Sequence, residues 1–160
     1  MTTSTHIDNI DGVNIKKFEL EDGEKVAWGR RVKRLDWKGP TGVLIITTNR
    51  LVFCPSSNWI EGMGTSIWEV KLDQISKISA EKWSGNMLFS SANAGVSITV
   101  SPIVGKVFDS IVKSYWLSTV RTKDGQVEYF NSLPNHFNWP TKESAEQLSS
   151  EMNDALDHIK

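Results

Sequence analysis

The sequence predicts one mostly β domain closed by a C-terminal α-helix. Three observations support this: short extended segments separated by turn residues from Glu24 onward, two β-branched apolar runs joined by a tight link, and apolar residues spaced by three or four positions after Thr141. A chain of 160 residues is close to the usual size of one domain and is long enough to bury a sizeable core.

The N-terminal segment shows no regular pattern. Residues 1 to about 12 are polar and without periodicity, so residues 1–13 are expected to form a flexible leader and residues 14–160 a single domain. The first strand is expected from Lys25 to about Leu35, with Val26, Trp28 and Val32 on one face.

A hairpin is predicted in the next part of the chain. Residues 39–42 read Gly-Pro-Thr-Gly, a strong turn signal. Two apolar, β-branched strands follow, Val43–Thr47 and Leu51–Cys54. The polar link between them is short enough for a tight hairpin, in which Asn49 can adopt the left-handed conformation.

Further strands are expected over residues 66–72, from 75 to about 83, and over 96–100, where polar and apolar residues alternate or β-branched residues recur. In the first of these, Trp68, Val70 and Leu72 should point inward. A short amphipathic helix is predicted over residues 102–114, because apolar residues there recur at three and four positions.

The chain ends with a hairpin and a helix. An Asp-Gly turn at residues 124–125 joins the strands expected over 116–122 and 126–130. Pro140 and Thr141 introduce the helix, since a Thr hydroxyl accepts hydrogen bonds from the free amides of a first turn. Its apolar stripe consists of Ala145, Leu148, Met152, Leu156 and Ile159.

Three segments carry a resemblance to a known family. Residues 20–26, 42–53 and 68–78 resemble the signature of GRAM domains and bacterial PH-like domains, members of the pleckstrin-homology superfold. The hairpin matches the pattern G-x-L-x-x-T-x-x-R-L-x-F from Gly42 to Phe53. The resemblance covers roughly Leu20 to Ile159, and residues 102–114 depart from it as an insertion.

The resemblance implies a PH-like half-open barrel of about seven antiparallel strands capped by one helix. Its relatives dock phosphoinositides, membranes or proteins and perform no chemistry. Kinship of fold does not select among these ligands.

Composition excludes several classes of function. Lys and Arg number 18 and Asp and Glu 19, so the net charge of −1 provides no global field to attract nucleic acid or an anionic membrane. The single cysteine, Cys54, lies in an apolar run, where a buried and inert thiol is the ordinary reading. One cysteine rules out an intramolecular disulfide and agrees with a cytoplasmic protein, either free or peripheral to a membrane.

Five cations near the end of the first strand form the candidate anion or lipid site: Arg30, Arg31, Lys33, Arg34 and Lys38. Guanidinium groups at this place in PH domains bind phosphate oxygens. However, residues 42–48 carry no basic residue, so half of the usual pattern is missing and a solvated or internally paired edge strand is favoured. Arg50 is expected to bind turn carbonyls or a nearby carboxylate.

Candidate contacts with a partner or a membrane come from two apolar groups: Met87, Leu88, Phe89, Val107, Phe108 and Ile111. The alternative for the first group is that it folds back over the core, and for the second that it covers the mouth of the barrel. No catalytic motif or cofactor signature is present, and His6, His136 and His158 are far apart in the sequence. Neither an enzyme nor a nucleic-acid-binding protein is therefore expected.

The leading hypothesis is a non-enzymatic binding module, a protein-protein adaptor or a self-assembling domain that forms homo-oligomers, with a membrane surface as one setting for this binding. The first alternative is recognition of phosphoinositide or anionic-lipid headgroups through the basic end of the first strand. The second alternative is a small barrel that holds an apolar ligand.

Overall fold

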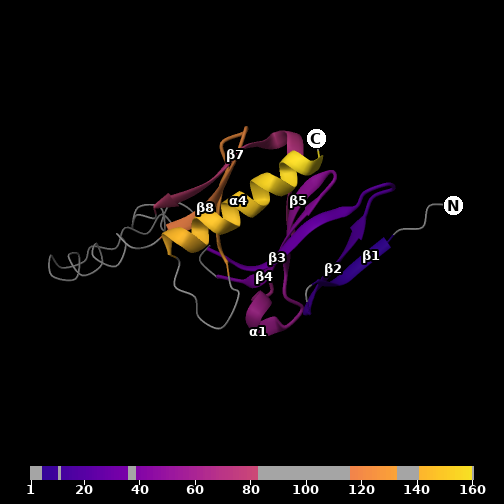
Figure 1. Cartoon of the computed structure of the whole chain (residues 1–160). Helices are drawn as coiled ribbons and strands as arrows, with labels where there is room; N and C mark the ends of the chain where they lie inside the picture. The colour runs from indigo at the N-terminus through magenta and orange to yellow at the C-terminus, as the bar shows by residue number, and fades with distance from the viewer. Residues whose placement is uncertain (1–4, 11, 36–38, 83–115, 133–140, 160) are drawn as a thin grey trace, which may run out of the picture.

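The computed structural model describes residues 5–10, 12–35, 39–82, 116–132 and 141–159. They form a seven-stranded antiparallel sheet, a separate two-stranded hairpin and a C-terminal helix (Figure 1), which confirms the predicted fold class. The elements are β1 (Thr5–Ile10), β2 (Val13–Leu20), β3 (Val26–Arg34), β4 (Thr41–Thr47), β5 (Arg50–Pro55), α1 (Trp59–Gly62), β6 (Trp68–Lys71), the 3-10 turn η1 (Leu72–Gln74), β7 (Ile75–Lys82), β8 (Trp116–Thr122), β9 (Val127–Ser132) and α4 (Lys142–Ile159).

The large sheet runs in the order β6-β5-β4-β3-β9-β8-β7, with antiparallel pairing throughout. Its first strand, β3, lies in the middle, with Val32 opposite Gly42 of β4 and Ser132 of β9. The predicted hairpin is confirmed, since Ile46 of β4 is opposite Leu51 of β5.

The side chains of β4 and β5 are buried on both faces of the sheet. On one face Leu44 and Phe53 belong to a core that includes Leu148 of α4. On the other face Val43 and Val52 belong to a second core beneath the β1–β2 hairpin. Successive residues of a strand point to opposite faces, so burial of both faces explains why these strands are continuously apolar instead of alternating.

Helix α4 packs across the first of these faces (Figure 1). Thr141 caps it, because its Oγ1 accepts a hydrogen bond from the amide of Ser144 at 3.1 Å. The predicted stripe is confirmed: Ala145, Leu148 and Met152 are buried, and Leu156 and Ile159 pack against the same core. Asn153 Nδ2 donates to the carbonyl of Ile78 at 3.1 Å, which adds a polar contact with β7.

The N-terminal segment differs from the flexible leader expected for residues 1–13. Residues 5–10 form β1, which pairs antiparallel with β2 and turns at Gly12, whose φ is +78°. Ile7 and Ile10 pack on the second core, together with Ile15 and Phe18 of β2. The β1–β2 hairpin is therefore held by burial against the face of the sheet that carries the second core. This is a contact with residues far away in the sequence.

The remaining predictions concern the face of Val26 and the bounds of four further elements. Val26 does not lie on the predicted inward face, since its side chain is 40% exposed. The cause is a shift in the register of the β3–β4 pairing between Val26 and Trp28. The strand expected over 66–72 is shorter, Trp68–Lys71, and that expected from 75 to about 83 is Ile75–Lys82. The strand predicted over 96–100 and the helix predicted over 102–114 lie outside the described residues.

Candidate functional site

The predicted basic cluster does not converge on one site. Alternation along β3 sends Arg30 and Arg34 to the face of Val32, toward the core under α4, and sends Arg31 and Lys33 to the opposite face. Lys38 lies outside the described residues. The strand is also central, between β4 and β9, and is not the edge strand that was expected.

The two arginines on the α4 face are held by carboxylates. Arg30 forms an ion pair with Glu151 of α4, and Glu151 also accepts a hydrogen bond from Trp28 Nε1 at 3.4 Å. Arg34 Nε donates to Glu128 Oε2 at 3.0 Å. These pairs fasten α4 and β9 to β3, so the expectation of internal pairing is confirmed for both arginines.

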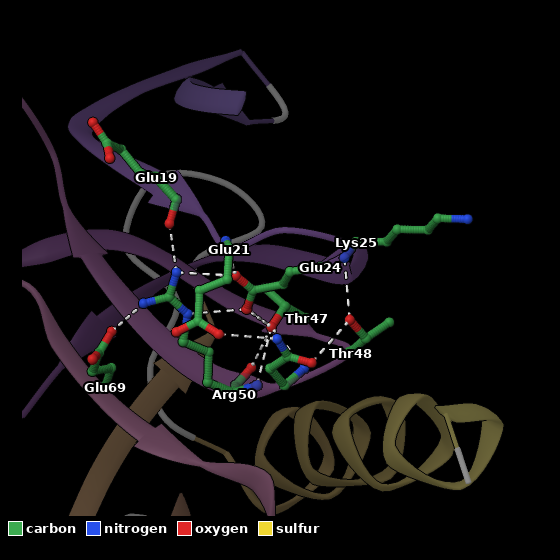
Figure 2. A network of polar contacts seen from close by, with 9 residues as sticks. Glu19, Glu21, Glu24, Lys25, Thr47, Thr48, Arg50 and Glu69 are labelled. Atoms are coloured by element: carbon green, nitrogen blue, oxygen red, sulfur yellow. Dashed lines mark hydrogen bonds and ion pairs between the residues drawn. The ribbon is translucent and has the colours of Figure 1, made fainter. Parts of the chain in front are cut away.

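Arg50 has the structural role expected of it (Figure 2). Its Nε and Nη2 donate to the two carboxylate oxygens of Glu24 at 3.0 and 3.1 Å, and Nη2 also donates to the carbonyl of Glu19 at 2.5 Å. Nη1 donates to Glu69 at 2.5 Å. The guanidinium thereby joins the end of β2, the residues before β3, and β6 around the β4–β5 turn.

The carboxylate of Glu24 is buried within this network. Burial by itself raises the pKa of a carboxyl group, but hydrogen bonds from Arg50, from the Thr47 hydroxyl and from the Glu21 amide outweigh it, so the pKa of Glu24 lies below its usual value. Glu24 is therefore ionised at neutral pH, and the network is a fully paired structural element.

A surface that the sequence did not predict lies at α1. Trp59 and Ile60 are 78% and 77% exposed, and Met63 beside them is 41% exposed. No helix and no contact surface was predicted for this segment. Asn58 directly before Trp59 was a usable signal, because Asn is a preferred residue at the start of a helix.

The backbone of α1 is held firmly although the helix is short. Asn58 Oδ1 accepts a hydrogen bond from the Ile60 amide at 2.9 Å, and the amide of Met63 donates to the Trp59 carbonyl at 2.9 Å. Gly62 packs so closely that a Cβ there would lie 2.2 Å from the carbonyl oxygen of Ser56. The end of β5 therefore supports α1, which presents Trp59 and Ile60 to the outside.

A polar groove of about 390 Å³ adjoins α1. It lies between the β1–β2 turn (residues 12–14), Arg31 of β3, and the segment that leads into α1 (residues 56–58 and Glu61). Arg31 Nη2 is 3.5 Å from Glu61 Oε1, and Ser56 Oγ donates to Glu61 Oε2 at 3.1 Å. Of the four predicted cations that the structure describes, Arg31 is the one that lines this groove.

The remaining predicted contacts are not placed. Met87, Leu88, Phe89, Val107, Phe108 and Ile111 all lie outside the described residues. Among the residues that are described, no three His, Cys, Asp or Glu side chains gather into a group that could hold a metal ion. Within the same residues, no helix combines the length and the apolar character needed to cross a membrane.

Comparison with known proteins found little similarity. No protein family matches the sequence, and no curated protein is similar to it. Among solved structures, the C-terminal domain of an unknown protein from Leishmania infantum is similar, with a TM-score of 0.44 and 15% sequence identity over 84% of this chain and 85% of that one.

Proposed function

We propose that this protein is a non-enzymatic binding module of the pleckstrin-homology type that docks a protein partner through Trp59, Ile60 and Met63, here called the α1 patch. The strand order supports the relationship to that superfold, because a first strand between the second and the last, followed by a helix across the sheet, is what a half-open barrel closed by its C-terminal helix requires.

The exposure of Trp59 and Ile60 carries the proposal. Large apolar side chains that stand together on a surface mark interaction sites, and tryptophan is strongly enriched among the residues that dominate binding energy. Because the backbone of α1 is already fixed by Asn58, Gly62 and Met63, little conformational entropy remains to be lost when a partner binds.

The two alternatives have less support. A headgroup site needs several cations directed at one phosphate, whereas Arg30 and Arg34 are bound to carboxylates on the other face of β3. An apolar ligand needs an empty interior, whereas Phe53, Phe130 and Met152 fill the core under α4 and are fully buried.

The test is a selection of random 12-residue peptides displayed on phage against the immobilised wild-type protein. The affinity of the enriched peptides is then measured by calorimetry for the wild type and for Trp59→Ser/Ile60→Ser. Loss of an interface hot spot of about 2 kcal/mol corresponds to a roughly 30-fold weaker Kd. The matched control is Val26→Ser, which removes an exposed apolar side chain at the far end of β3.

The proposal fails if no peptide is enriched, or if the enriched peptides bind the double variant as well as the wild type. It also fails if the wild type, but not the double variant, sediments with vesicles of phosphatidylcholine and phosphatidylserine, because the α1 patch would then bind a membrane. Light scattering of both proteins shows whether the partner is a second copy of this chain. In that case the wild type should form an oligomer and the double variant should be monomeric.

A further inference from the structure

We infer that the partner inserts a carboxylate into the polar groove beside α1, where Arg31 receives it, so that the segment bound at the α1 patch is an acidic and apolar peptide. This inference rests on the proposed function. The link is physical, because α1 contributes to both features: Asn58 and Glu61 line the groove, and Trp59 and Ile60 between them stand out from it.

Arg31 is the arginine least engaged in the fold. Its ion pair with Glu61 is 3.5 Å long, whereas Arg34, Arg50 and Arg121 reach carboxylates at 3.0, 2.5 and 2.6 Å. The Nε atom of Arg31 is buried and makes no hydrogen bond with any described residue. A charge-assisted hydrogen bond normally measures about 2.7–2.9 Å, so most of the donor capacity of Arg31 is unused.

The groove offers further donors around this guanidinium. Asn14 Oδ1 and Asn58 Oδ1 each accept a hydrogen bond, from Asn9 and from the Ile60 amide, which leaves the two Nδ2 groups to donate elsewhere. Ser57 is exposed on the same lining. One guanidinium surrounded by neutral donors matches the planar, two-oxygen geometry of a carboxylate.

A phosphate group fits this groove poorly. Among its described lining residues Arg31 is the one cation and Glu61 the one anion, so the charges of the groove nearly balance. A phosphomonoester carries about 1.5 to 2 negative charges at neutral pH, which Glu61 would repel and a single arginine would not neutralise. A carboxylate carries one charge, so Arg31 can pair with it while Glu61 stays bonded to Ser56.

The test is a double-mutant cycle between Arg31 and the peptides selected above. Each selected peptide is synthesised as found and with its Asp and Glu replaced by Asn and Gln, and both forms are titrated into the wild type and Arg31→Gln. The acidic form should bind Arg31→Gln about 10- to 100-fold more weakly than the wild type, the loss expected for a hydrogen bond between charged groups. The amide form should bind the wild type and Arg31→Gln with equal affinity. The affinity of Arg31→Lys for the acidic form should lie between those of the wild type and Arg31→Gln.

Arg121→Gln is the matched control, because Arg121 is 40% exposed and Arg31 41%, but Arg121 lies on β8 beside Glu81. The inference is overturned if Arg31→Gln changes the two peptide forms equally, or if the selected peptides lack acidic residues; binding that still depends on Trp59 then leaves the proposed function standing. It is also overturned if Arg31 governs sedimentation with phosphatidylserine vesicles instead of peptide binding. If substitution of neither Trp59 nor Arg31 changes the affinity of the selected peptides, both the proposed function and the inference are overturned.

Discussion

The buried pair of Arg50 and Glu24 allows a direct test of what holds the β4–β5 turn in place. The side chain of Glu24 is completely buried and that of Arg50 nearly so, and two hydrogen bonds join them (Figure 2). Arg50→Met removes the cation and leaves a carboxylate inside the protein. Loss of one partner of a buried ion pair costs about 3–5 kcal/mol of unfolding free energy.

The control is Glu69→Gln, which removes the other carboxylate bound by Arg50. Glu69 is exposed, so its ion pair should contribute less than about 1 kcal/mol. A second variant, Arg50→Met/Glu24→Met, removes both buried charges and should recover at least about 2 kcal/mol of the loss in Arg50→Met, since replacing a whole buried pair by apolar residues is often near neutral. Unfolding in urea at neutral pH measures all three differences.

Acid pH provides an independent check of the same reasoning. The pKa of Glu24 in the folded protein lies below its ordinary value of 4.5, so its contribution to stability is complete above that value and is lost as the pH falls through the folded pKa. In Arg50→Met the Thr47 hydroxyl and the Glu21 amide still oppose the effect of burial, but the largest opposing contribution is gone, so the pKa of Glu24 is higher than in the wild type. Protonation then relieves the buried charge, and the difference in unfolding free energy between the variant and the wild type narrows as the pH falls from neutral to below 4.5. A gap that stays constant with pH, or a loss at neutral pH no larger than that of Glu69→Gln, would refute the account of a buried ion pair.

Three further predictions concern the core and α1. Leu148→Ala should lower the free energy of unfolding by about 2–5 kcal/mol in urea titrations, because Leu148 is fully buried between α4 and the sheet; a loss under 1 kcal/mol would contradict this packing. Gly62→Ala should destabilise the protein by about 1–3 kcal/mol and weaken peptide binding at Trp59, because the added Cβ meets the Ser56 carbonyl; an unchanged thermal midpoint would count against the fixed position of α1. The Cys54 thiol, whose pKa burial raises to about 12, should react with a thiol reagent only in denaturant, and rapid labelling of the native protein would disprove its burial.

Periodicity and turn chemistry predicted more of the fold than of the site. The β4–β5 hairpin, the β8–β9 hairpin and the stripe on α4 were all predicted from local spacing and turn residues, and the structure contains them. The role of Arg50 was also anticipated, although Glu24 was not predicted to be its main partner.

The site could be predicted only in part. Arg31 belonged to the predicted basic cluster, and alternation along the strand places it on the face opposite to Arg30. The sequence could not show that Arg31 is the less engaged of the two, because that depends on which carboxylate each arginine meets across the fold. Trp59 and Ile60 were missed because a four-residue helix contains too little periodicity to detect.

Periodicity and turn residues by themselves determined that this chain forms antiparallel strands closed by a C-terminal helix, because both signals act over a few neighbouring residues. The tertiary structure decided which segment covers the second face of β4 and β5, and which arginines remain available to bind a partner. Both depend on contacts between distant segments. The β1–β2 hairpin packs on side chains of β4 and β5, and Arg30 pairs with Glu151, which lies 121 positions away in the sequence. Local patterns encode an element, but the identity of its neighbour is settled only when the whole chain packs.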